Sequence, residues 1–386
     1  MQVTESHDLI VAGLGAVGSA VVFQTARSGA SVLGFDRYEP PHAHGSTHGD
    51  TRVFRTAIAE GGEYVPLARR SQEIWRQIER ETGEDLLVQC GGLIAGVHST
   101  TSQHGVDDFL NMTVRTARRF GIEHEELAAA DIKQRYPQFA FTNEDGYFEP
   151  AAGFIRPEAT VTAQLELARR SGAVTRFGER LVSFSHDKAG VTVVTTRGRY
   201  RAGKLVMAVG AWIGEFVPRS VFQVYRQVLY WFDVEPDWYA AYRDSPVFIW
   251  EFGHHPADFI YGLPALDGAG GGVKLASESY AAPMSPEGVR PGVTKKEKDA
   301  FYDSHVRGRF AGLTDTCLRA VSCLYTVTPD YRFVIDTHPD SPHVIVASPC
   351  SGHGFKHSAA VGEAVAQLAL GGRTDIDLDG FRLDRF

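Results

Sequence analysis

The sequence predicts an α/β (α+β) fold in which a Rossmann-like domain carries a second, mainly antiparallel β domain inserted into it. A glycine-rich strand–turn–helix pattern opens the chain, and segments of the same kind return at residues 204–212 and 343–372. Between them lie strand-like runs rich in β-branched and aromatic residues, such as residues 224–236 and 247–252. Because 386 residues are more than one compact core usually holds, two domains are expected.

The opening segment has the pattern of a dinucleotide-binding site. Residues 8–12 form an apolar run that is typical of a buried parallel strand, and glycines in G-x-G-x-x-G spacing follow it. These glycines allow a tight turn, close approach of the backbone to a pyrophosphate, and packing of the next helix, expected at residues 16–27. A second strand then ends at an acid that can accept hydrogen bonds from ribose hydroxyls. The residues expected to bind the dinucleotide here are Gly13, Gly15, Ala16, Val17, Gly18, Asp36 and Arg37.

This segment alone leaves the dinucleotide open. Asp36 favours NAD or FAD over NADP, because an acid at this position suits a free 2′-hydroxyl. A nicotinamide dehydrogenase would usually continue with further βαβ units. Residues 37–66 instead form a long loop rich in proline, glycine and histidine, and loops of this length are usually functional.

Further elements follow from hydrophobic periodicity. The pattern predicts an amphipathic helix at residues 67–82 and a pair of strands within residues 86–97. It also predicts helices near residues 104–120 and 127–135, and mostly strand between residues 220 and 320.

The order of these elements divides the chain into two discontinuous domains. The dinucleotide-binding domain is expected at residues 1–84, 145–218 and 322–386, and the substrate-binding domain at residues 85–144 and 219–321.

Composition excludes several classes of function. Acidic residues exceed lysine plus arginine by 47 to 39 and no basic run is present, so a nucleic-acid partner is not expected. No apolar stretch is long enough to cross a membrane, and the first strand begins too early for a signal peptide, so a cytoplasmic location is expected. The four cysteines lack C-x-x-C spacing, so neither a disulfide framework nor a metal site is expected.

Four stretches carry a resemblance to a known family: "DLIVAGLGAVGSA", "HGSTHGDTRVFR…EYVPLARRSQEIW", "SCLYTVTPDYRFVID" and "SGHGFKHSAAVGE". They resemble the monomeric sarcosine oxidase and N-methyltryptophan oxidase family, amine-oxidising flavoproteins of the D-amino-acid-oxidase fold group. The resemblance implies FAD as the cofactor, a small amino-acid or amine substrate, molecular oxygen as the acceptor, and a monomeric chain.

The resemblance also implies roles for residues whose chemistry suits them. Arginine supplies a planar, permanently charged donor, and the position of Arg55 binds the substrate carboxylate in the family, together with the position of Lys356. Arg52 matches a position near the flavin, and Lys274 matches a lysine that assists the reaction with oxygen. From the residues alone, these cations could equally face solvent. Two tyrosines match further active-site positions, Tyr261 and Tyr325.

The remaining cofactor contacts implied by the resemblance include a covalent bond. Cys323 matches the cysteine that forms a thioether to the flavin, although an inert buried thiol is the alternative from sequence alone. Successive backbone N–H groups in the loop at residues 351–357 can face an anion, and the family places this loop beside the flavin ring. His357 is expected to be a surface histidine. The other cofactor-binding residues are Ser46, His48, Thr51, Gly352, His353 and Gly354 together with Lys356.

The sequence departs from the family pattern where the substrate amine would be bound. Glu278 stands where the family often has a histidine, and Ile58 stands where a tyrosine is common. An acid beside the amine suits a bulkier or more cationic substrate, and three aromatic residues are candidates to lie near it, namely Trp231, Trp250 and Phe252.

The expected function is oxidation of a secondary, N-alkyl amino acid to an imine, which hydrolyses to an amine and an aldehyde, with production of hydrogen peroxide. The alternative is a biosynthetic flavin oxidase or dehydrogenase that acts on a cyclic imine or a bulkier amine. A flavin dehydrogenase with another electron acceptor, a NAD-dependent dehydrogenase and a non-catalytic flavin-binding module also stay open.

Overall fold

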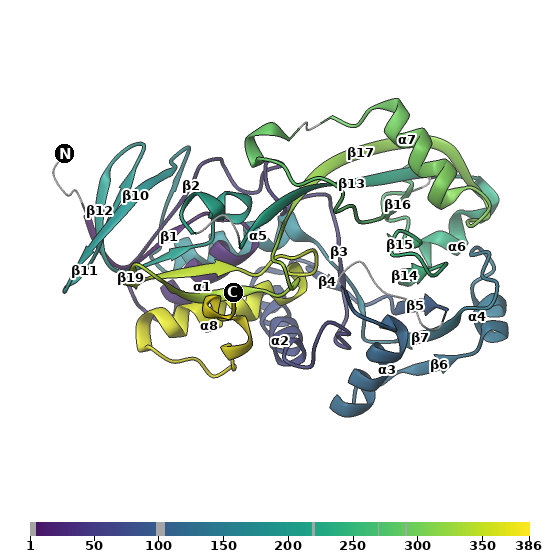
Figure 1. Cartoon of the computed structure of the whole chain (residues 1–386), viewed down its shortest axis with the longest axis horizontal. Helices are drawn as coiled ribbons and strands as arrows, with labels where there is room; N and C mark the ends of the chain where they lie inside the picture. The colour runs from purple at the N-terminus through teal and green to yellow at the C-terminus, as the bar shows by residue number, and fades with distance from the viewer. Residues whose placement is uncertain (1–4, 98–104, 218–220, 269, 290–291) are drawn as a thin grey trace.

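The computed structural model describes residues 5–97, 105–217, 221–268, 270–289 and 292–386. Two sheets occupy the two ends of an elongated molecule, and long strands run between them (Figure 1). A helix near the C-terminus, drawn in yellow, lies below one of these sheets in the same view.

The first sheet is built around β1 (Glu5–Ala12), whose last four residues are buried. β1 pairs in parallel with β2 and β12, as the apolar run at its end predicts. β12 is parallel to β1 at its buried end and antiparallel to β11 at its start. The strands of this sheet are β10 (Leu181–Asp187), β11 (Gly190–Thr195), β12 (Arg199–Met207), β1, β2 (Val32–Asp36) and β9 (Val174–Phe177), with β19 (Ser341–Ser348) beside β12 and β18 (Val334–His338) beside β19.

Four helices cover this sheet. The predicted first helix is found at its predicted bounds, and it packs against the last long helix (Figure 1). The contact is close, since a Cβ at Gly362 would lie 2.3 Å from the Cβ of Ala20. The helices are α1 (Ala16–Arg27), α2 (Tyr64–Thr82), α5 (Pro157–Arg170) and α8 (Ser358–Gly371).

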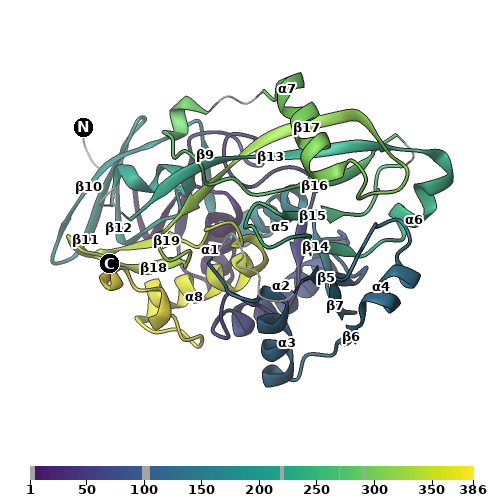
Figure 2. The same cartoon turned by 45° about the vertical axis from the view of Figure 1, so that its right-hand side comes forward.

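The second sheet is dominated by two long antiparallel strands, β13 and β17, which lie along the top of the molecule in Figure 2. β15 and β16 pair antiparallel in the same sheet, and β5, within the predicted pair of strands at residues 86–97, belongs to it too. β7 joins it too, although residues 145–149 were assigned to the other domain from sequence. The strand order is β17 (Leu313–Val327), β13 (Gln223–Val234), β16 (Val273–Ala276), β15 (Phe259–Leu263), β14 (Val247–Glu251), β5 (Gly92–Gly96), β7 (Asp145–Glu149) and β6 (Glu125–Leu127).

A small third sheet and two short helices complete this half of the chain. The helices confirm the prediction near residues 104–120 and 127–135, except that residue 104 lies outside the described residues. The elements are β3 (Arg52–Phe54), β8 (Gly153–Ile155) and β4 (Leu87–Val88) in the third sheet, and α3 (Phe109–Phe120) and α4 (Ala129–Arg135), which both contact β7 of the second sheet.

The prediction of mostly strand between residues 220 and 320 is partly wrong. Two short helices, α6 (Tyr239–Arg243) and α7 (Lys295–Phe301), interrupt the strands, and a π-helical turn follows α7. A capping box between Thr294 and Glu297 begins α7, and this T-x-x-E pattern was a signal in the sequence.

No helix in the described part of the chain is both long and apolar enough to cross a lipid bilayer.

Candidate active site

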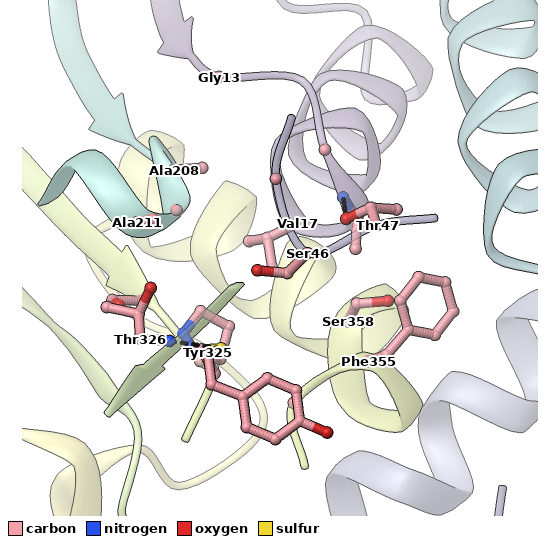
Figure 3. A pocket seen from close by; sticks show the side chains of 18 of the residues that line it. Gly13, Val17, Ser46, Thr47, Ala208, Ala211, Tyr325, Thr326, Phe355 and Ser358 are labelled. Atoms are coloured by element: carbon pink, nitrogen blue, oxygen red, sulfur yellow. Dashed lines mark hydrogen bonds between the residues drawn. The ribbon is translucent and has the colours of Figure 1, made fainter. Parts of the chain in front are cut away.

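One large cavity extends from the glycine-rich turn after β1 to the second sheet. Figure 3 shows Gly13 and Val17 above, with Tyr325 and Phe355 below. Segments from both sheets contribute to the cavity, because its lining includes residues of the β1–α1 turn, the loop after β2, β15, β17 and the loop before α8.

The glycine-rich turn adopts a shape that requires glycine at two positions. Gly13 has φ of +87°, and a Cβ there would lie 2.4 Å from the carbonyl oxygen of Ala208. A Cβ at Gly18 would lie 1.7 Å from the carbonyl oxygen of Gly13, so Gly18 does not line the cavity but lets α1 pack against the turn. The N-terminus of α1 therefore opens into the cavity, where Ala16 donates its N–H to Thr47 Oγ1 at 3.3 Å.

Asp36 and Arg37 line the same end of the cavity. The Asp36 carboxylate accepts hydrogen bonds from the backbone N–H of Leu14 at 2.7 Å and of Tyr38 at 2.9 Å, so it also holds the turn in place. Arg37 forms an ion pair with Glu287 at 2.5 Å on the surface.

Two buried hydroxyl groups on the cavity wall have no hydrogen-bond partner among the described residues. They belong to Ser358, the first residue of α8, and Thr326, near the end of β17 (Figure 3). Since buried polar groups are normally hydrogen-bonded, these hydroxyls indicate that a polar ligand belongs in the cavity.

Arg55 lines the cavity and is buried. Its Nη2 donates to both carboxylate oxygens of Glu60, at 2.9 and 2.8 Å, and Nη1 donates to the carbonyl oxygen of Ala57. The guanidinium also lies over the ring of Phe109, 5.2 Å from its centre. Sequence reasoning missed Glu60 and Phe109; an acid five residues after a predicted anion-binding arginine was the only signal.

Lys356 lines the cavity with Arg55. It lies in a short 3₁₀ turn before α8, and its ammonium donates to the carbonyl oxygen of His353 at 2.9 Å. Burial and then the nearby charge of Arg55 lower the pKa of Lys356 to about 7. The two predicted carboxylate-binding cations therefore belong to one cavity.

Tyr261 on β15 and Tyr325 on β17 face the cavity and pack with Cys323 in a small cluster. Burial raises the pKa of both phenols above the ordinary value, so both hydroxyls are neutral at physiological pH.

A second cationic region lies behind the cavity wall. Lys274 on β16 donates to the carbonyl oxygens of Gly49 and Thr51 at 2.6 and 2.7 Å, and to Thr51 Oγ1 at 3.1 Å. Its ammonium also lies 5.3 Å from the centre of the Trp231 ring. Burial first, and then the charge of Arg52, lower the pKa of Lys274.

His48 belongs to this second region. Burial and then the charges of Arg52 and Lys274 lower the pKa of His48 to about 4, so the imidazole is neutral at physiological pH. Its Nε2 has no hydrogen-bond partner within the described part of the chain.

The structure brings most of the predicted site residues to the cavity wall. His48, Thr51, Lys274 and Cys323 lie behind that wall, with Gly18 under the glycine turn. The predicted residues that line the cavity are Gly13, Gly15, Ala16, Val17, Asp36, Arg37, Ser46, Arg52, Arg55, Tyr261, Tyr325, Gly352, His353, Gly354 and Lys356.

Several predictions for the substrate end are wrong. Trp250 packs in the core of the second sheet and donates its indole N–H to Glu144, and Ile58 is fully buried in the core. Trp231 and Phe252 do not line the cavity either. The apolar part of the cavity wall instead includes Ile249, the residue before Trp250, together with Phe109 and Phe259.

His357 is also placed differently from the prediction. It is fully buried rather than on the surface, and burial followed by the charge of Lys356 lowers its pKa. Neither ring nitrogen has a hydrogen-bond partner among the described residues.

A glycine-rich turn at a helix N-terminus is typical of a dinucleotide-binding site. Because one cavity joins this turn to two buried cations, the fold and the site are those of a dinucleotide-dependent enzyme. Comparison with known proteins identifies the family. The model of the FAD dependent oxidoreductase family matches residues 8–368. The chain belongs to this family and is an FAD-dependent oxidoreductase.

Relatives in sequence share nearly the whole chain. It is 36% identical to a monomeric sarcosine oxidase of Streptomyces avermitilis, over 96% of this chain and 95% of the relative. It is 34% identical to an N-methyl-L-tryptophan oxidase of Salmonella dublin, over 98% of this chain and 99% of the relative. Among solved structures, NikD, an amino acid oxidase of nikkomycin biosynthesis, has a TM-score of 0.83 at 23% identity, covering 98% of both chains.

The cavity fits FAD. The glycine turn and the N-terminus of α1 would hold the pyrophosphate, and the Asp36 carboxylate, which lines the same end of the cavity, would accept hydrogen bonds from ribose hydroxyls. The unpartnered hydroxyls of Ser358 and Thr326 supply polar contacts further along the same cavity.

Proposed function

We propose that the protein is an oxidase of secondary amino acids, in particular N-methyl amino acids, with molecular oxygen as the electron acceptor. The single observation that supports this most strongly is that Arg55 and Lys356 line the same cavity as the glycine turn. The relatives named sarcosine oxidase and N-methyl-L-tryptophan oxidase support the same substrate class.

In this proposal, Arg55 and Lys356 bind the substrate carboxylate. Arg55 holds a carboxylate already, that of Glu60, with two hydrogen bonds from one nitrogen. A substrate carboxylate replaces or shares this contact and takes a further hydrogen bond from Lys356, whose ammonium contacts one carbonyl oxygen. By binding the carboxylate, the two cations orient the α-carbon and the amine of the substrate.

The walls of the cavity keep the substrate amine neutral. Ile249 and Phe259 exclude water from one side, and the cations of Arg52, Arg55 and Lys356 disfavour a further positive charge. Both effects lower the pKa of a bound amine and leave its lone pair free. FAD, when bound, supplies the redox chemistry: it accepts a hydride equivalent from the substrate and passes two electrons to oxygen, giving hydrogen peroxide.

Lys274 and Cys323 have roles behind the cavity wall in this proposal. Lys274 holds a buried positive charge at Gly49 and Thr51, which favours the negative charge that oxygen gains on reduction. Cys323 would form a thioether to FAD: its S–H bond and a C–H bond of the flavin methyl group are replaced by an S–C bond, and the two electrons pass to the flavin and then to oxygen. The monomeric state and the cytoplasmic location stay predictions.

The proposal is tested by measuring hydrogen peroxide from the purified yellow protein with a panel of N-methyl amino acids, their primary amino acids, and cyclic imines. Production of peroxide and of formaldehyde from N-methyl substrates is the expected result. Reduction of the flavin by cyclic imines alone would favour the alternative function. Reduction by N-methyl substrates without reaction with oxygen would identify a dehydrogenase.

A further inference from the structure

A buried carboxylate lies next to the segment that follows the substrate-binding arginine, and it has no role in the proposed reaction. It belongs to Glu149, the last residue of β7, which is fully buried and does not line the large cavity. The chain turns after Glu149 into β8, and Gly153 at the start of β8 pairs with Phe54 at the end of β3. This pairing brings Glu149 beside the residues that come after Phe54, of which Arg55 is the first.

Both oxygens of the Glu149 carboxylate accept hydrogen bonds. Oε1 accepts from the backbone N–H of Thr56 at 2.8 Å and from the Thr56 hydroxyl. Oε2 accepts from the backbone N–H of Ala57 at 3.1 Å and from the Tyr147 hydroxyl at 2.9 Å. Burial first, and then the charge of Glu149, raise the pKa of Tyr147, so its hydroxyl keeps the proton that it donates. An ionised carboxylate only accepts hydrogen bonds, so it can serve all four donors at once.

These contacts fix a residue that in turn holds Arg55. The N–H of Ala57 donates to Glu149, while the carbonyl oxygen of Ala57 accepts from Arg55 Nη1. The other nitrogen, Nη2, donates to Glu60, which lines the cavity. A substrate carboxylate competes with Glu60 for Nη2 and leaves the contact of Nη1 with Ala57 in place. The position of Ala57 therefore sets the direction of the guanidinium while a ligand binds.

The charges near this segment give the removal of Glu149 a predictable electrostatic sign. All four donors to Glu149 are neutral groups, so these hydrogen bonds rather than an ion pair compensate for its burial. The positive charges of Arg55 and Lys356 line the cavity, as does Arg52, which donates to two carbonyl oxygens within residues 46–51. Removing a negative charge behind these cations favours an anion bound to them. Loss of a positioning contact disfavours that anion, so the two effects have opposite signs.

We propose that Glu149 is a positioning residue for substrate binding. It fixes the turn at residues 56–57, so that Arg55 keeps its direction into the cavity when the substrate carboxylate replaces Glu60. This inference rests on the proposed function, because it takes a carboxylate as the ligand of Arg55. It adds that the affinity for carboxylates depends on a residue outside the cavity, contributed by the second sheet.

The first experiment measures carboxylate binding without oxidation, by calorimetric titration of the holoenzyme with propionate. Glu149→Gln keeps the shape of the side chain, but in either orientation of the amide one of the two backbone N–H groups loses its acceptor. We expect propionate to bind about 30-fold more weakly, since a displacement of about 1 Å in a site can cost about 100-fold. Unchanged or tighter binding would overturn the proposal, because it would leave only the electrostatic effect.

Two further variants grade the effect. Tyr147→Phe removes one hydroxyl donor and leaves both backbone contacts of Glu149, so propionate affinity should change less than about 3-fold. Glu149→Asp keeps the charge on a side chain that is one methylene shorter, and should weaken binding about 10-fold. This variant also decides the question if Glu149→Gln gives no folded holoenzyme, since unchanged affinity in Glu149→Asp would equally overturn the proposal.

Glu144→Gln is the matched control for stability. Glu144 is a buried carboxylate that accepts from the N–H of Asn143 at 3.0 Å and from the indole N–H of Trp250 at 2.9 Å, and it does not line the cavity. Both glutamine variants should lower the midpoint of unfolding in urea. Only Glu149→Gln should weaken the binding of propionate. An equal loss of affinity in both variants would show a general structural effect and overturn the positioning role.

A double variant tests whether Glu149 acts through Arg55. Arg55→Lys keeps a positive charge but has one terminal nitrogen, so it cannot contact Ala57 and a ligand through separate nitrogens. In this background, Glu149→Gln should change propionate affinity less than about 3-fold, because the two residues act as one unit. A loss of about 30-fold in both backgrounds would assign the effect to another part of the cavity and contradict the proposal.

The binding experiment separates this inference from the proposed function. If Glu149→Gln weakens propionate binding but no N-methyl amino acid reduces the flavin, the oxidase proposal fails and the positioning role stands. If N-methyl amino acids are oxidised and Glu149→Gln binds propionate as wild type does, the oxidase proposal stands and the positioning role fails. Absence of propionate binding in wild type would overturn the carboxylate site, and the positioning role with it.

Discussion

Two buried lysines of the site differ in what their ammonium groups contact. Lys274 donates to three oxygen atoms of the segment at residues 49–51 and does not line the cavity. Lys356 donates to one carbonyl oxygen and lines the cavity beside Arg55. Both pKa values are lowered by burial. Among the described residues Lys274 has three acceptors and Lys356 has one, so Lys356 keeps donors for a ligand.

The number of donors left for a ligand decides whether a buried ammonium acts through its charge alone or through a direct hydrogen bond. An ammonium has three donors, and three acceptors from the protein leave none for a ligand. Lys274 can therefore act only through its charge, whereas Lys356 can form a direct hydrogen bond to a substrate. We call the two regions the clamp, meaning Arg55, Glu60 and Lys356, and the rear site, meaning His48, Thr51, Lys274 and Cys323.

The largest expected effect is in the clamp. Arg55→Met removes the hydrogen bonds to the substrate carboxylate and leaves Glu60 buried without its cation. We expect kred/Kd for an N-methyl amino acid to fall about 1000-fold, because a charge-assisted contact to the substrate is lost and Glu60 loses the charge of Arg55. Anaerobic stopped-flow measurement of flavin reduction gives this ratio.

A second variant distinguishes lost binding from lost stability. Removing one partner of a buried ion pair costs about 3–5 kcal/mol in free energy of unfolding. Arg55→Met combined with Glu60→Gln should recover part of that free energy and none of the activity. Recovery of activity in the double variant would show that Arg55 serves only to neutralise Glu60.

The second largest expected effect concerns Lys274 in the rear site. Lys274→Met keeps most of the length of the side chain and removes its charge. The rate constant for reaction of the reduced enzyme with oxygen should fall about 100-fold, the usual effect of one electrostatic contact to developing charge. Flavin reduction by substrate should change less than about 3-fold, because Lys274 lies behind the cavity wall. Oxygen consumption after single-turnover reduction measures the first quantity.

The exposed Lys188 supplies a matched control, since Lys188→Met removes the same charge at the surface. Equal losses in both half-reactions of Lys274→Met would place this lysine in the clamp rather than in the rear site, and the comparison of the two lysines would fail.

Much of the first sheet could be predicted because its signals are local. The spacing of Gly13, Gly15 and Gly18 gave the turn, and the helix after it was found at its predicted residues. The strand pairings of the second sheet join segments far apart in sequence, and β7 shows this, since only its partners β5 and β6 place it there. Composition and periodicity do not contain that information.

The sequence did not show in which direction each side chain points, and this limited the prediction of the site. Trp250 was expected near the substrate, but successive residues of a strand face opposite sides, and its neighbour Ile249 lines the cavity instead. Glu60 is close to Arg55 in sequence, yet nothing in the pattern indicated that the two side chains meet. The position of Lys274 behind the wall depends on its contacts with residues more than two hundred positions away.

A smaller expected effect concerns the protonation of Lys356 in the clamp, which changes the affinity for carboxylate ligands. Since the pKa of Lys356 is lowered to about 7, its ammonium loses the proton as the pH rises above that value. A carboxylate ligand binds the protonated form, so its affinity should be constant below pH 7 and fall above it, by up to about tenfold per pH unit. Titration of the holoenzyme with propionate between pH 6 and 9 measures this change without the complication of a titrating amine.

The variant Lys356→Met tests the origin of this pH dependence. It should bind propionate about 30-fold more weakly below pH 7 and show a flat profile above it. A slope that persists in the variant would assign the titration to another group, and the difference between Lys356 and Lys274 would lose its chemical basis.

The smallest expected effect on turnover concerns two thiols, Cys323 of the rear site and Cys350 of the cavity wall. Cys323 is 2% exposed and packs with Leu229 and Trp231, while Cys350 lines the cavity and accepts a hydrogen bond from the N–H of Thr326 at 3.3 Å. The resemblance to the family selects Cys323 for the covalent bond, whereas exposure to the cavity would select Cys350.

Cys323→Ser should give a colourless acid precipitate and a protein mass without the cofactor, with turnover changed only a few-fold. Cys350→Ser should keep the yellow precipitate and the added mass. The reverse pattern would move the covalent bond to the cavity wall, and the rear site would then consist of Lys274, His48 and Thr51 alone.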